Sequence, residues 1–427
     1  MKIFKQLKYI KLVLDKTKLS LRRSDWNALE EADCLTVWHE NDCGYVFKNK
    51  LYCGLILSIT ERLARKNISA ISIVKPYGNL NSDNANGAPL LFNRDFFIAE
   101  IIDKINNLLF TSPKNKKYIL WGRILDVVKP KYIIGIQPDS FLCKAARDRG
   151  IRIYDLQHGV ISTSHAWYGK TAKELDAINL PTDFLCWDTS SASAIRGWAE
   201  DKGIRVHVTG NPWFQRFQCV DSEDQVVNEL IRNNLSVTDD KPKILVTLQW
   251  GLERFYNDSD EHDGYLPIAL KKLITSPLQQ YNWLIRLHPV QLRGSERARC
   301  FQFLEKEFGG LGNVEWLRTS EAPLPLILSI IDLHITDMSS VVIEASWFGV
   351  PSALLSMHIK PGGRLEGYFD EQFSSGYAKV VKQDKSSIEA WITEQLSYDK
   401  ERVPSSAKTV DILTVVSDGI NNGSIRE

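Results

Sequence analysis

A histidine and a glycine end an apolar segment in the sequence IRIYDLQHG, residues 151–159. Gln157, His158 and Gly159 follow residues that favour a buried strand. A neutral imidazole is the usual side chain for taking a proton near neutral pH, and glycine allows close approach to the backbone. His158 is therefore a candidate general base, although a histidine in this place can also serve only to hydrogen-bond the end of a strand.

A second group of residues is suited to binding phosphate. Arg286 and His288 are two residues apart in LIRLHP, so on a strand their side chains point to the same face. Both can donate hydrogen bonds to a phosphate oxygen. Pro289 stops the strand and thereby places His288 at its end.

The most informative motif is HITDMSSVVIEASWFGVP, residues 334–351. A strand that ends at Asp337 is followed by Ser339 and Ser340, where a helix should begin. Serine oxygens can cap a helix, and the free N–H groups of a first helical turn attract anions. Glu344 comes one turn later and can accept hydrogen bonds from ribose hydroxyls, or it is a solvated charge on an ordinary capped helix.

Near the middle of the chain, the segment VTGNP (208–212) places Gly210 and Asn211 at a turn. A Gly-Asn-Pro turn is common in loops and carries no chemistry by itself. Its position at the end of one series of strands and helices makes these two residues candidates for a hinge or for the lining of a cleft.

The candidate residues belong to a regular alternation of strands and helices. Strands are predicted over 34–39, 69–74, 131–137, 151–157, 183–188, 204–210, 243–249, 282–288, 313–317, 331–336, 351–356 and 377–381. Helices are predicted between them, for example over 140–149, 192–203, 265–275, 296–308 and 340–348. This alternation predicts parallel sheets with crossover helices. Such sheets bind ligands outside the carboxyl ends of their strands, where the motifs above occur.

The length of 427 residues favours two domains of roughly 200 residues each. We predict an α/β protein of the GT-B type, in which two Rossmann-like domains face each other across a cleft and C-terminal helices can cross back. His158 would then look across the cleft at the phosphate-binding residues. The predicted boundaries are a basic amphipathic segment at 1–23, a first domain at 24–212, a linker at 213–239, a second domain at 240–385 and C-terminal helices at 386–427.

Composition excludes several classes of protein. The net charge of +1 provides no general attraction for nucleic acid. The seven cysteines are scattered and form no C-x-x-C pair, which argues against a disulfide framework or zinc site and favours a reducing cytoplasm. No run of 18 apolar residues is present to span a bilayer.

The first 23 residues contain eight Lys or Arg against one Asp. Ile3, Leu7, Ile10 and Leu14 recur at helical spacing, and lysines interrupt the apolar positions, which argues against a signal peptide. This segment can lie on the anionic inner surface of the cytoplasmic membrane. Equally, it can be a basic first helix that packs on its own domain.

Taken together, LQHG, TGNP, RLHP and TDMSSVVIEASWFGVP are similar in order and spacing to motifs of bacterial surface-polysaccharide glycosyltransferases of the GT-B fold. Over roughly residues 130–360 the sequence resembles bacterial sialyltransferases, Kdo transferases of capsule and O-antigen synthesis, and CDP-glycerol glycerophosphotransferases of teichoic acid synthesis. The resemblance implies that His288, Ser339 and Ser340 hold the donor phosphate and that Glu344 lies near the nucleotide ribose. It also implies that His158 deprotonates the acceptor.

The sequence departs from the retaining Kdo transferases at the strand 243–249. There VTLQWG has Gln249, a further cleft candidate, followed by Trp250, where those enzymes have an Asp nucleophile. This departure disfavours a covalent route. No Asp-x-Asp motif stands at a strand end, and the acidic segment 256–264 is interpreted as a solvated loop. We therefore predict no metal and no cofactor apart from the donor substrate.

The predicted activity is transfer of a sugar from a nucleotide-activated donor to a hydroxyl of a glycan or lipid-linked glycan. A CMP-sugar is slightly preferred over UDP, GDP or TDP donors. A second possibility is a sugar-nucleotide epimerase, which shares the fold and the Ser-Ser…Glu…Gly-x-Pro arrangement but needs further acid/base carboxylates. A phosphotransferase that uses CDP-linked polyols and a non-catalytic nucleotide-binding protein are the remaining possibilities.

Overall fold

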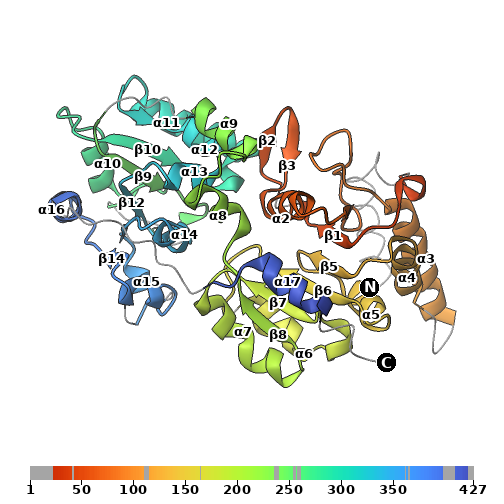
Figure 1. Cartoon of the computed structure of the whole chain (residues 1–427). Coiled ribbons are helices and arrows are strands. Elements are labelled where there is room, and N and C mark those ends of the chain that lie inside the picture. The colour runs from red at the N-terminus through yellow and green to blue at the C-terminus, as the bar shows by residue number, and fades with distance from the viewer. Residues whose placement is uncertain are drawn as a thin grey trace. The chain divides into compact units, whose positions relative to one another are not determined.

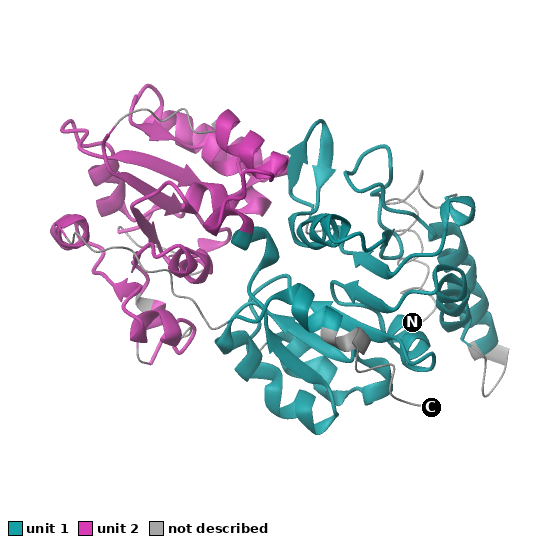
Figure 2. Ribbon diagram, viewed as in Figure 1, with its two compact units in different colours: residues 1–215, 407–427 teal, residues 216–406 magenta. Residues whose placement is uncertain are grey.

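The computed structural model describes residues 23–40, 43–109, 115–163, 165–234, 240–252, 256, 261–360, 362–363, 366–397 and 409–421. Two compact units form, one from residues 1–215 with 407–427 and the other from residues 216–406 (Figure 2). Apart from Arg23, the predicted basic segment 1–23 lies outside the described residues. Among the helices described, none has the length and apolarity needed to cross a bilayer.

Unit 1 is built on a parallel six-stranded sheet in the order β4-β1-β5-β6-β7-β8. Strands β1, β5, β6, β7 and β8 are labelled in Figure 1. Its strands are β1 Cys34–Trp38, β4 Ala70–Val74, β5 Tyr132–Gly135, β6 Arg152–Leu156, β7 Asp183–Cys186 and β8 Arg205–Val208. The chain passes from β1 to β4 on one side and then to β5 on the other. The order therefore reverses between β1 and β5, which is where open α/β sheets bind ligands.

The connections of unit 1 are mainly helical. The longer helices are α2 Gly54–Arg65, α3 Asn93–Leu109, α4 Lys116–Val128, α5 Ser140–Arg147 and α7 Thr189–Asp201. The shorter elements are the 3-10 helix η2 Trp26–Ala28, the hairpin β2 Tyr45–Phe47 and β3 Lys50–Tyr52, the π-helix η4 Ala166–Thr171, α6 Ala172–Glu174 and η5 Ala177–Asn179. Carboxylate and amide side chains start three of these helices, because Asn115, Asp139 and Asp188 accept N–H bonds from the first turns of α4, α5 and α7.

Unit 2 repeats the architecture, with a parallel sheet in the order β11-β10-β9-β12-β13-β14. Its strands are β9 Lys243–Thr247, β10 Asn282–Arg286, β11 Val314–Glu315, β12 Leu333–Thr336, β13 Ser352–Leu354 and β14 Ala378–Val380. The order reverses between β9 and β12. Helices α10 Ile268–Ile274, η7 Pro289–Leu292, α11 Gly294–Phe308, α12 Leu317–Glu321, α13 Leu324–Leu328, α14 Val341–Trp347, η8 Met357–Ile359, α15 Asp370–Ser374 and α16 Lys385–Ser397 complete the unit.

Apolar clusters on both faces of the unit 2 sheet explain the continuous apolar runs in its strands. Ile244, Val246 and Ile335 pack with side chains of α10, α11 and α16. Leu354 belongs to a different cluster, with Val342 of α14. Strands covered on both faces lose the alternation of polar and apolar residues, and the resulting apolar runs are what the sequence displays.

The region between the sheets differs from the prediction. The sequence predicts a linker at 213–239, yet α8 Pro212–Gln218 and α9 Gln225–Asn234 fall within or overlap this range. The boundary between the units follows Gln215, inside α8. Arg216 and Asp224 form two hydrogen bonds of 2.6 Å, and Asp224 also accepts the N–H of Val227 in α9. Ion pairing and capping support these two helices, together with the buried side chains of Trp213, Phe214 and Phe217 in α8 and of Val226 and Val227 in α9.

The last described segment packs on unit 1, as predicted for helices that cross back. Helix α17, Ile412–Asn421, belongs to that unit. The N–H of Val410 donates to the carbonyl of Val208 at the end of β8 (2.9 Å), and Tyr154 Oη donates to the carbonyl of Val415 (3.5 Å).

Candidate functional site

In unit 2, Gln249 joins the turns that follow two strands. Its Oε1 accepts the N–H of Met338, after β12, at 2.8 Å. Its carbonyl accepts Nε2 of Gln291, after β10, at 3.1 Å. Gln249 therefore connects the turn that carries the predicted residue His288 with the residue that directly follows the predicted Asp337, at the carboxyl edge of the sheet. We call Gln249, His288, Gln291, Asp337 and Met338 the unit 2 cluster.

His288 is fixed in orientation by this cluster. It caps η7, whose first residue is the predicted Pro289, and its Nδ1 accepts the N–H of Val290 at 3.2 Å. In return, Oε1 of Gln291 accepts the N–H of His288 at 2.8 Å. Burial lowers the pKa of His288, which favours the neutral ring. Because Nδ1 is an acceptor, the proton of that neutral ring resides on Nε2, which is thereby a hydrogen-bond donor.

Both carboxylate oxygens of Asp337 contact other side chains of unit 2. Its Oδ1 accepts Tyr256 Oη at 2.8 Å, and Nε2 of the buried His262 lies 3.4 Å from Oδ2. His262 Nδ1 accepts the N–H of Gly264 at 2.9 Å, so the ring proton is directed to Asp337. The rings of Tyr256 and His262 stack with centroids 4.1 Å apart. Both carboxylate oxygens therefore hold the segment after β9 against the end of β12.

The two serines sit at the start of α14, as predicted, but only one acts as a cap. Ser340 is the N-cap residue, yet its backbone is helical and its hydroxyl makes no cap bond. Ser339 Oγ instead accepts the N–H of Val341 at 3.3 Å. Glu344 lies in the first turn of α14 and is half-buried. After burial itself, its charge is a further cause of the raised pKa of Tyr368.

Arg286 is at the end of β10, where its Nη1 donates to the carbonyls of Thr319 and Ala322, the latter at 2.9 Å. These bonds tie the strand to α12. Arg286 is therefore at least partly committed to supporting the fold beside His288, a role that the sequence does not indicate.

In unit 1, His158 lies just beyond β6 in a turn that is held by its neighbour. Gln157 is buried; its Nε2 donates to the carbonyl of Gly159 (2.7 Å) and to Ser191 Oγ (3.0 Å). Its Oε1 accepts the N–H of Trp187 at 2.7 Å. The predicted cleft residues Gln157 and Gly159 therefore define the turn that carries His158.

The ring of His158 stacks on that of His39, which follows β1, with centroids 5.6 Å apart. Its Nδ1 is buried and has no hydrogen-bond partner among the residues that the structure describes. Burial, followed by the charges of His39, Lys75 and His165, lowers the pKa of His158 to about 4. The imidazole is therefore neutral at physiological pH and able to accept a proton, although it is a weaker base than an exposed histidine.

Carboxylates at the same edge of the sheet are occupied by N–H and O–H donors. Asp155 is buried and accepts the N–H of Gln137 at 2.8 Å; Tyr168 Oη is 3.5 Å away. Burial raises the pKa of Asp155 to about 7. Asp139 and Asp188 serve as helix caps, and burial raises the pKa of each.

Gly210 and Asn211 form the junction between β8 and α8. Gly210 has φ +75°, a conformation that favours glycine. Asn211 is buried, and its Oδ1 accepts the N–H groups of Trp213 (3.0 Å) and Phe214 (3.3 Å). These contacts make Asn211 the cap of α8.

Four residues of these two sites, His39, Lys75, Gln291 and His262, are not predicted from the sequence. His39 and Lys75 directly follow β1 and β4. Both could have been predicted as site residues, because each is a polar residue at the end of a predicted strand. Gln291 orients His288, and His262 contacts Asp337. The sequence around Gln291 and His262 does not indicate either contact. Among the residues described, no group of three or more His, Cys, Asp or Glu is arranged to hold a metal ion.

Comparison with known proteins identifies the fold. No protein-family model matches the sequence, and no curated protein matches it either. UDP-GlcNAc 2-epimerase from Neisseria meningitidis bound to UDP-GlcNAc is similar in structure, with a TM-score of 0.56, 13% identity, and coverage of 91% of this chain and 99% of the epimerase. The wall teichoic acid polymerase TagF has a TM-score of 0.52 and 13% identity over 99% of this chain and 96% of its own. The chain has the two-domain GT-B fold.

Proposed function

We propose that this protein is a glycosyltransferase that moves a sugar from a nucleotide-activated donor to a hydroxyl of a bacterial surface glycan. The observation that carries the proposal is the pair of imidazoles at the carboxyl edges of the two sheets. One is the neutral His158, and the other is His288 with its Nε2–H available as a donor. A base for the acceptor and a donor for the leaving phosphate are the two groups that this reaction needs.

In the proposed step, the acceptor oxygen forms a bond to the anomeric carbon while the bond from that carbon to the donor phosphate breaks. The hydroxyl proton passes to Nε2 of His158. The charge left on the nucleotide phosphate is stabilised by Nε2–H of His288, with Ser339 and Ser340 close to the same edge. Arg286, Pro289 and Asp337 support this group, and Glu344 is assigned to the ribose. The step requires no metal.

The similar structure of the Neisseria epimerase, which was solved with UDP-GlcNAc bound, supports a nucleotide-sugar partner. TagF, a wall teichoic acid polymerase, supports a role in the synthesis of a surface glycan. By analogy of fold, we assign nucleotide binding to the unit 2 cluster. We retain the preference for a cytidine nucleotide, with UDP, GDP and TDP as the other candidates.

An epimerase is the second candidate, because the fold is shared with UDP-GlcNAc 2-epimerases. An epimerase needs carboxylates that exchange protons with the sugar. Among the carboxylates described at the edge of the unit 1 sheet, Asp155 and Asp188 are buried and Asp139 is half-buried, and all three accept N–H bonds. Because these carboxylates already accept hydrogen bonds from the protein, we favour sugar transfer to an acceptor over epimerisation.

The first experiment identifies the nucleotide. Thermal unfolding of the full chain with CMP, CDP, UDP, GDP and TDP should show stabilisation by one nucleotide, because a ligand that binds only the folded state raises the unfolding temperature. The matched variants are His288→Gln, which removes the oriented donor, and Arg299→Gln, at an exposed position of α11. His288→Gln should reduce the nucleotide-induced shift, and Arg299→Gln should preserve it.

The second experiment separates the two enzymes. The protein is incubated with sugars of the stabilising nucleotide, with and without a glycan acceptor, and products are identified by mass spectrometry and NMR. Sugar transfer that requires the acceptor and continues in EDTA supports the proposal. Conversion of the nucleotide sugar to an epimer without acceptor would replace it with the second candidate.

A further inference from the structure

The outer side of α3 is apolar. Its inner side packs on α4, since the rings of Phe96 and Trp121 lie 5.0 Å apart. Ala99 and Asp103 lie on the same side and are buried, and Oδ1 of Asp103 accepts the N–H of Lys116 at 2.6 Å. Residues two positions apart in a helix differ in direction by about 200°. The residues two positions after the three inner ones therefore lie on the opposite side, and all are isoleucines: Ile98, Ile101 and Ile105.

These three isoleucines form one exposed row, which we call the α3 stripe. Their exposed fractions are 48%, 37% and 49%. The i, i+3, i+7 spacing places the side chains next to one another along about two turns of the helix. The solvent side of a surface helix is normally polar. Exposed apolar side chains that are grouped in this way mark a surface that a partner covers.

Residues 1–22, which lie outside the described part of the chain, join unit 1 beside the first turn of α3. The carbonyl of Arg23 accepts the N–H of Arg94 at 3.2 Å. The next residue, Ser24, contacts a carboxylate oxygen of Asp95 through its Oγ. Because Asp95 lies about one turn before the α3 stripe, the segment joins the fold close to that stripe.

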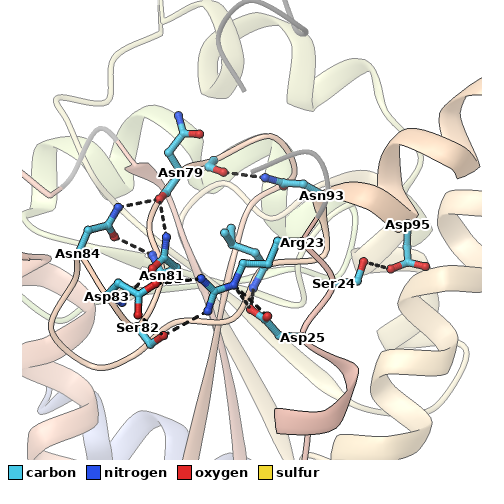
Figure 3. A network of polar contacts seen from close by, with 12 residues as sticks. Arg23, Ser24, Asp25, Asn79, Asn81, Ser82, Asp83, Asn84, Asn93 and Asp95 are labelled. Carbon is cyan, nitrogen blue, oxygen red and sulfur yellow. Dashed lines mark hydrogen bonds and ion pairs between the residues drawn. The ribbon is translucent and has the colours of Figure 1, made fainter. Parts of the chain in front are cut away.

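Polar contacts fix this point of attachment (Figure 3). The guanidinium of Arg23 donates to Asp25 at 2.9 Å. It also donates to Ser82 Oγ at 3.2 Å and to Asp83 at 3.3 Å, both in the loop that leads to α3. The segment 1–22 is therefore attached at a fixed position beside α3.

The sequence of the segment matches the length of the stripe. Its apolar positions recur at helical spacing and form one side of a helix: Ile3, Leu7, Ile10 and Leu14. The ends of this row are about 17 Å apart on a helix, and those of the α3 stripe are about 11 Å apart. Residues 15–22 remain for the connection and can span up to about 28 Å. The row can therefore lie along the whole stripe.

Net charge favours the segment over an anionic bilayer as the partner of this surface. Residues 1–22 contain seven Lys or Arg and one Asp. Helix α3 contains three acidic and two basic residues, so its net charge has the opposite sign. Anionic lipid headgroups attract basic segments, and a helix with a net negative charge gives them no such attraction.

We propose that residues 1–22 form an amphipathic helix that packs on the α3 stripe and covers it. The segment runs antiparallel to α3, because its last residue lies beside the start of that helix. Burial of the two apolar rows against each other stabilises the contact, and the lysines on the other side of the segment face solvent. This inference selects one of the two roles that the sequence leaves open for the segment, and it does not depend on the proposed transferase activity.

The test measures hydrogen–deuterium exchange of the full chain by mass spectrometry. Amides of a docked segment exchange mainly when it detaches, so weaker docking speeds their exchange. In Ile98→Asp/Ile105→Asp, residues 3–14 should exchange at least about tenfold faster than in the wild type. Leu278→Asp is the matched control, since it places a charge on an apolar side chain that is 74% exposed in unit 2. It should leave the exchange of residues 3–14 unchanged.

The reciprocal variant Leu7→Asp/Ile10→Asp changes the other side of the contact. Residues 98–105 should then exchange faster than in the wild type, whereas α16 should keep its rate. This variant alters none of the described residues, so it decides the matter even if Ile98→Asp/Ile105→Asp fails to fold. Wild-type exchange of residues 3–14 in folded Ile98→Asp/Ile105→Asp, or of residues 98–105 in Leu7→Asp/Ile10→Asp, would overturn the proposal.

Two other occupants of the stripe give different results. If the segment requires a bilayer, residues 3–14 exchange slowly only when vesicles of phosphatidylglycerol and phosphatidylcholine in equal amounts are added. If the stripe binds a second copy of the chain, protection of residues 98–105 rises with protein concentration, and light scattering detects a dimer. Either result contradicts docking within one chain. Slow exchange of both regions in a monomer without vesicles, at every concentration, supports it.

Discussion

Oε1 of Gln249 accepts the backbone N–H of Met338 at 2.8 Å, while the carbonyl of the same residue accepts Nε2 of Gln291 at 3.1 Å. The turn that carries His288 and the turn that leads to Ser339 are therefore connected through one residue. The amide has an architectural role, since it aligns the two segments to which we assign nucleotide binding.

Replacing Gln249 by Leu should weaken nucleotide binding. The change leaves the N–H of Met338 without its acceptor, at a cost of about 1–3 kcal/mol in the free energy of unfolding. It also uncouples the two turns, so the affinity for the nucleotide should fall. Titration of the stabilising nucleotide by calorimetry measures it. Gln249→Glu keeps an acceptor for Met338 and should bind more tightly than Gln249→Leu. Gln302→Leu, at an exposed position of α11, is the control, and an equal loss there would refute the role of Gln249.

The pH dependence of transfer should report the lowered pKa of His158. With a neutral acceptor, kcat/KM should fall as the pH decreases through about 4, because the protonated ring cannot accept the hydroxyl proton. His158→Gln should lose about 10²–10⁴-fold in rate and the acid limb with it. Circular dichroism at each pH distinguishes loss of activity from unfolding. An acid limb centred at the ordinary pKa of histidine would show that the ring is not buried in the working enzyme.

Strands are the most predictable part of the molecule. Ile153 and Leu156 of β6, and Ile244 and Val246 of β9, are buried on a sheet covered by helices, and that environment leaves continuous apolar runs in the sequence. The hairpin β2–β3 is not predicted, because each of its strands has three residues, too few to show an alternation. Its pairing is set by tertiary contacts, such as the bonds from Asn86 Nδ2 to the carbonyls of Phe47 and Lys50.

The local sequence indicates which residues lie at the ends of strands and helices, but it does not indicate which of their side chains contact one another. His158, His288 and Ser339 occur at strand or helix ends, which the local sequence indicates. The stacking of His158 on His39 depends on β1, β5 and β6 being neighbours, and strand order is not encoded locally. In the same way, the capping role predicted for Ser340 is taken by Ser339, because Ser340 has a helical backbone that directs its hydroxyl elsewhere.

Acid should destabilise the fold in part through His334. This residue is buried between Thr247 Oγ1 and Ser352 Oγ, each 2.9 Å away, and burial lowers its pKa to about 3. The unfolded chain binds the proton first, so stability is complete above the ordinary pKa and falls as the pH decreases from about 6.5 towards 3, by up to ~1.4 kcal/mol per pH unit for this group.

Urea unfolding at several pH values between about 6.5 and 5 measures this slope for the wild type and for His334→Gln, which can still hydrogen-bond but does not titrate. His39 and His158, whose pKa values burial also lowers, contribute with the same sign and remain in the variant. The variant should therefore have a shallower slope rather than none. Identical slopes would mean that the pKa of His334 is not lowered in the folded state, which would contradict the prediction.

Attachment of α8 to unit 1 should depend on the absence of a side chain at Gly54. A Cβ atom there would lie 2.7 Å from Cγ of Trp213, and the rings of Tyr45 and Tyr52 also contact this indole. Because the indole cannot move without displacing two other rings, Gly54→Ala should cost about 1–3 kcal/mol of unfolding free energy.

Gly197→Ala, in the middle of α7, is the matched control, since no atom lies within 4 Å of the position that its new methyl group would take. That change should be neutral or stabilising by up to ~1 kcal/mol, because alanine favours helix more than glycine does. Urea unfolding of both variants measures the difference. If the two variants have the same free energy of unfolding, the close contact between Gly54 and Trp213 does not hold the start of α8 against α2. Trp213 could then shift to accommodate a methyl group at residue 54.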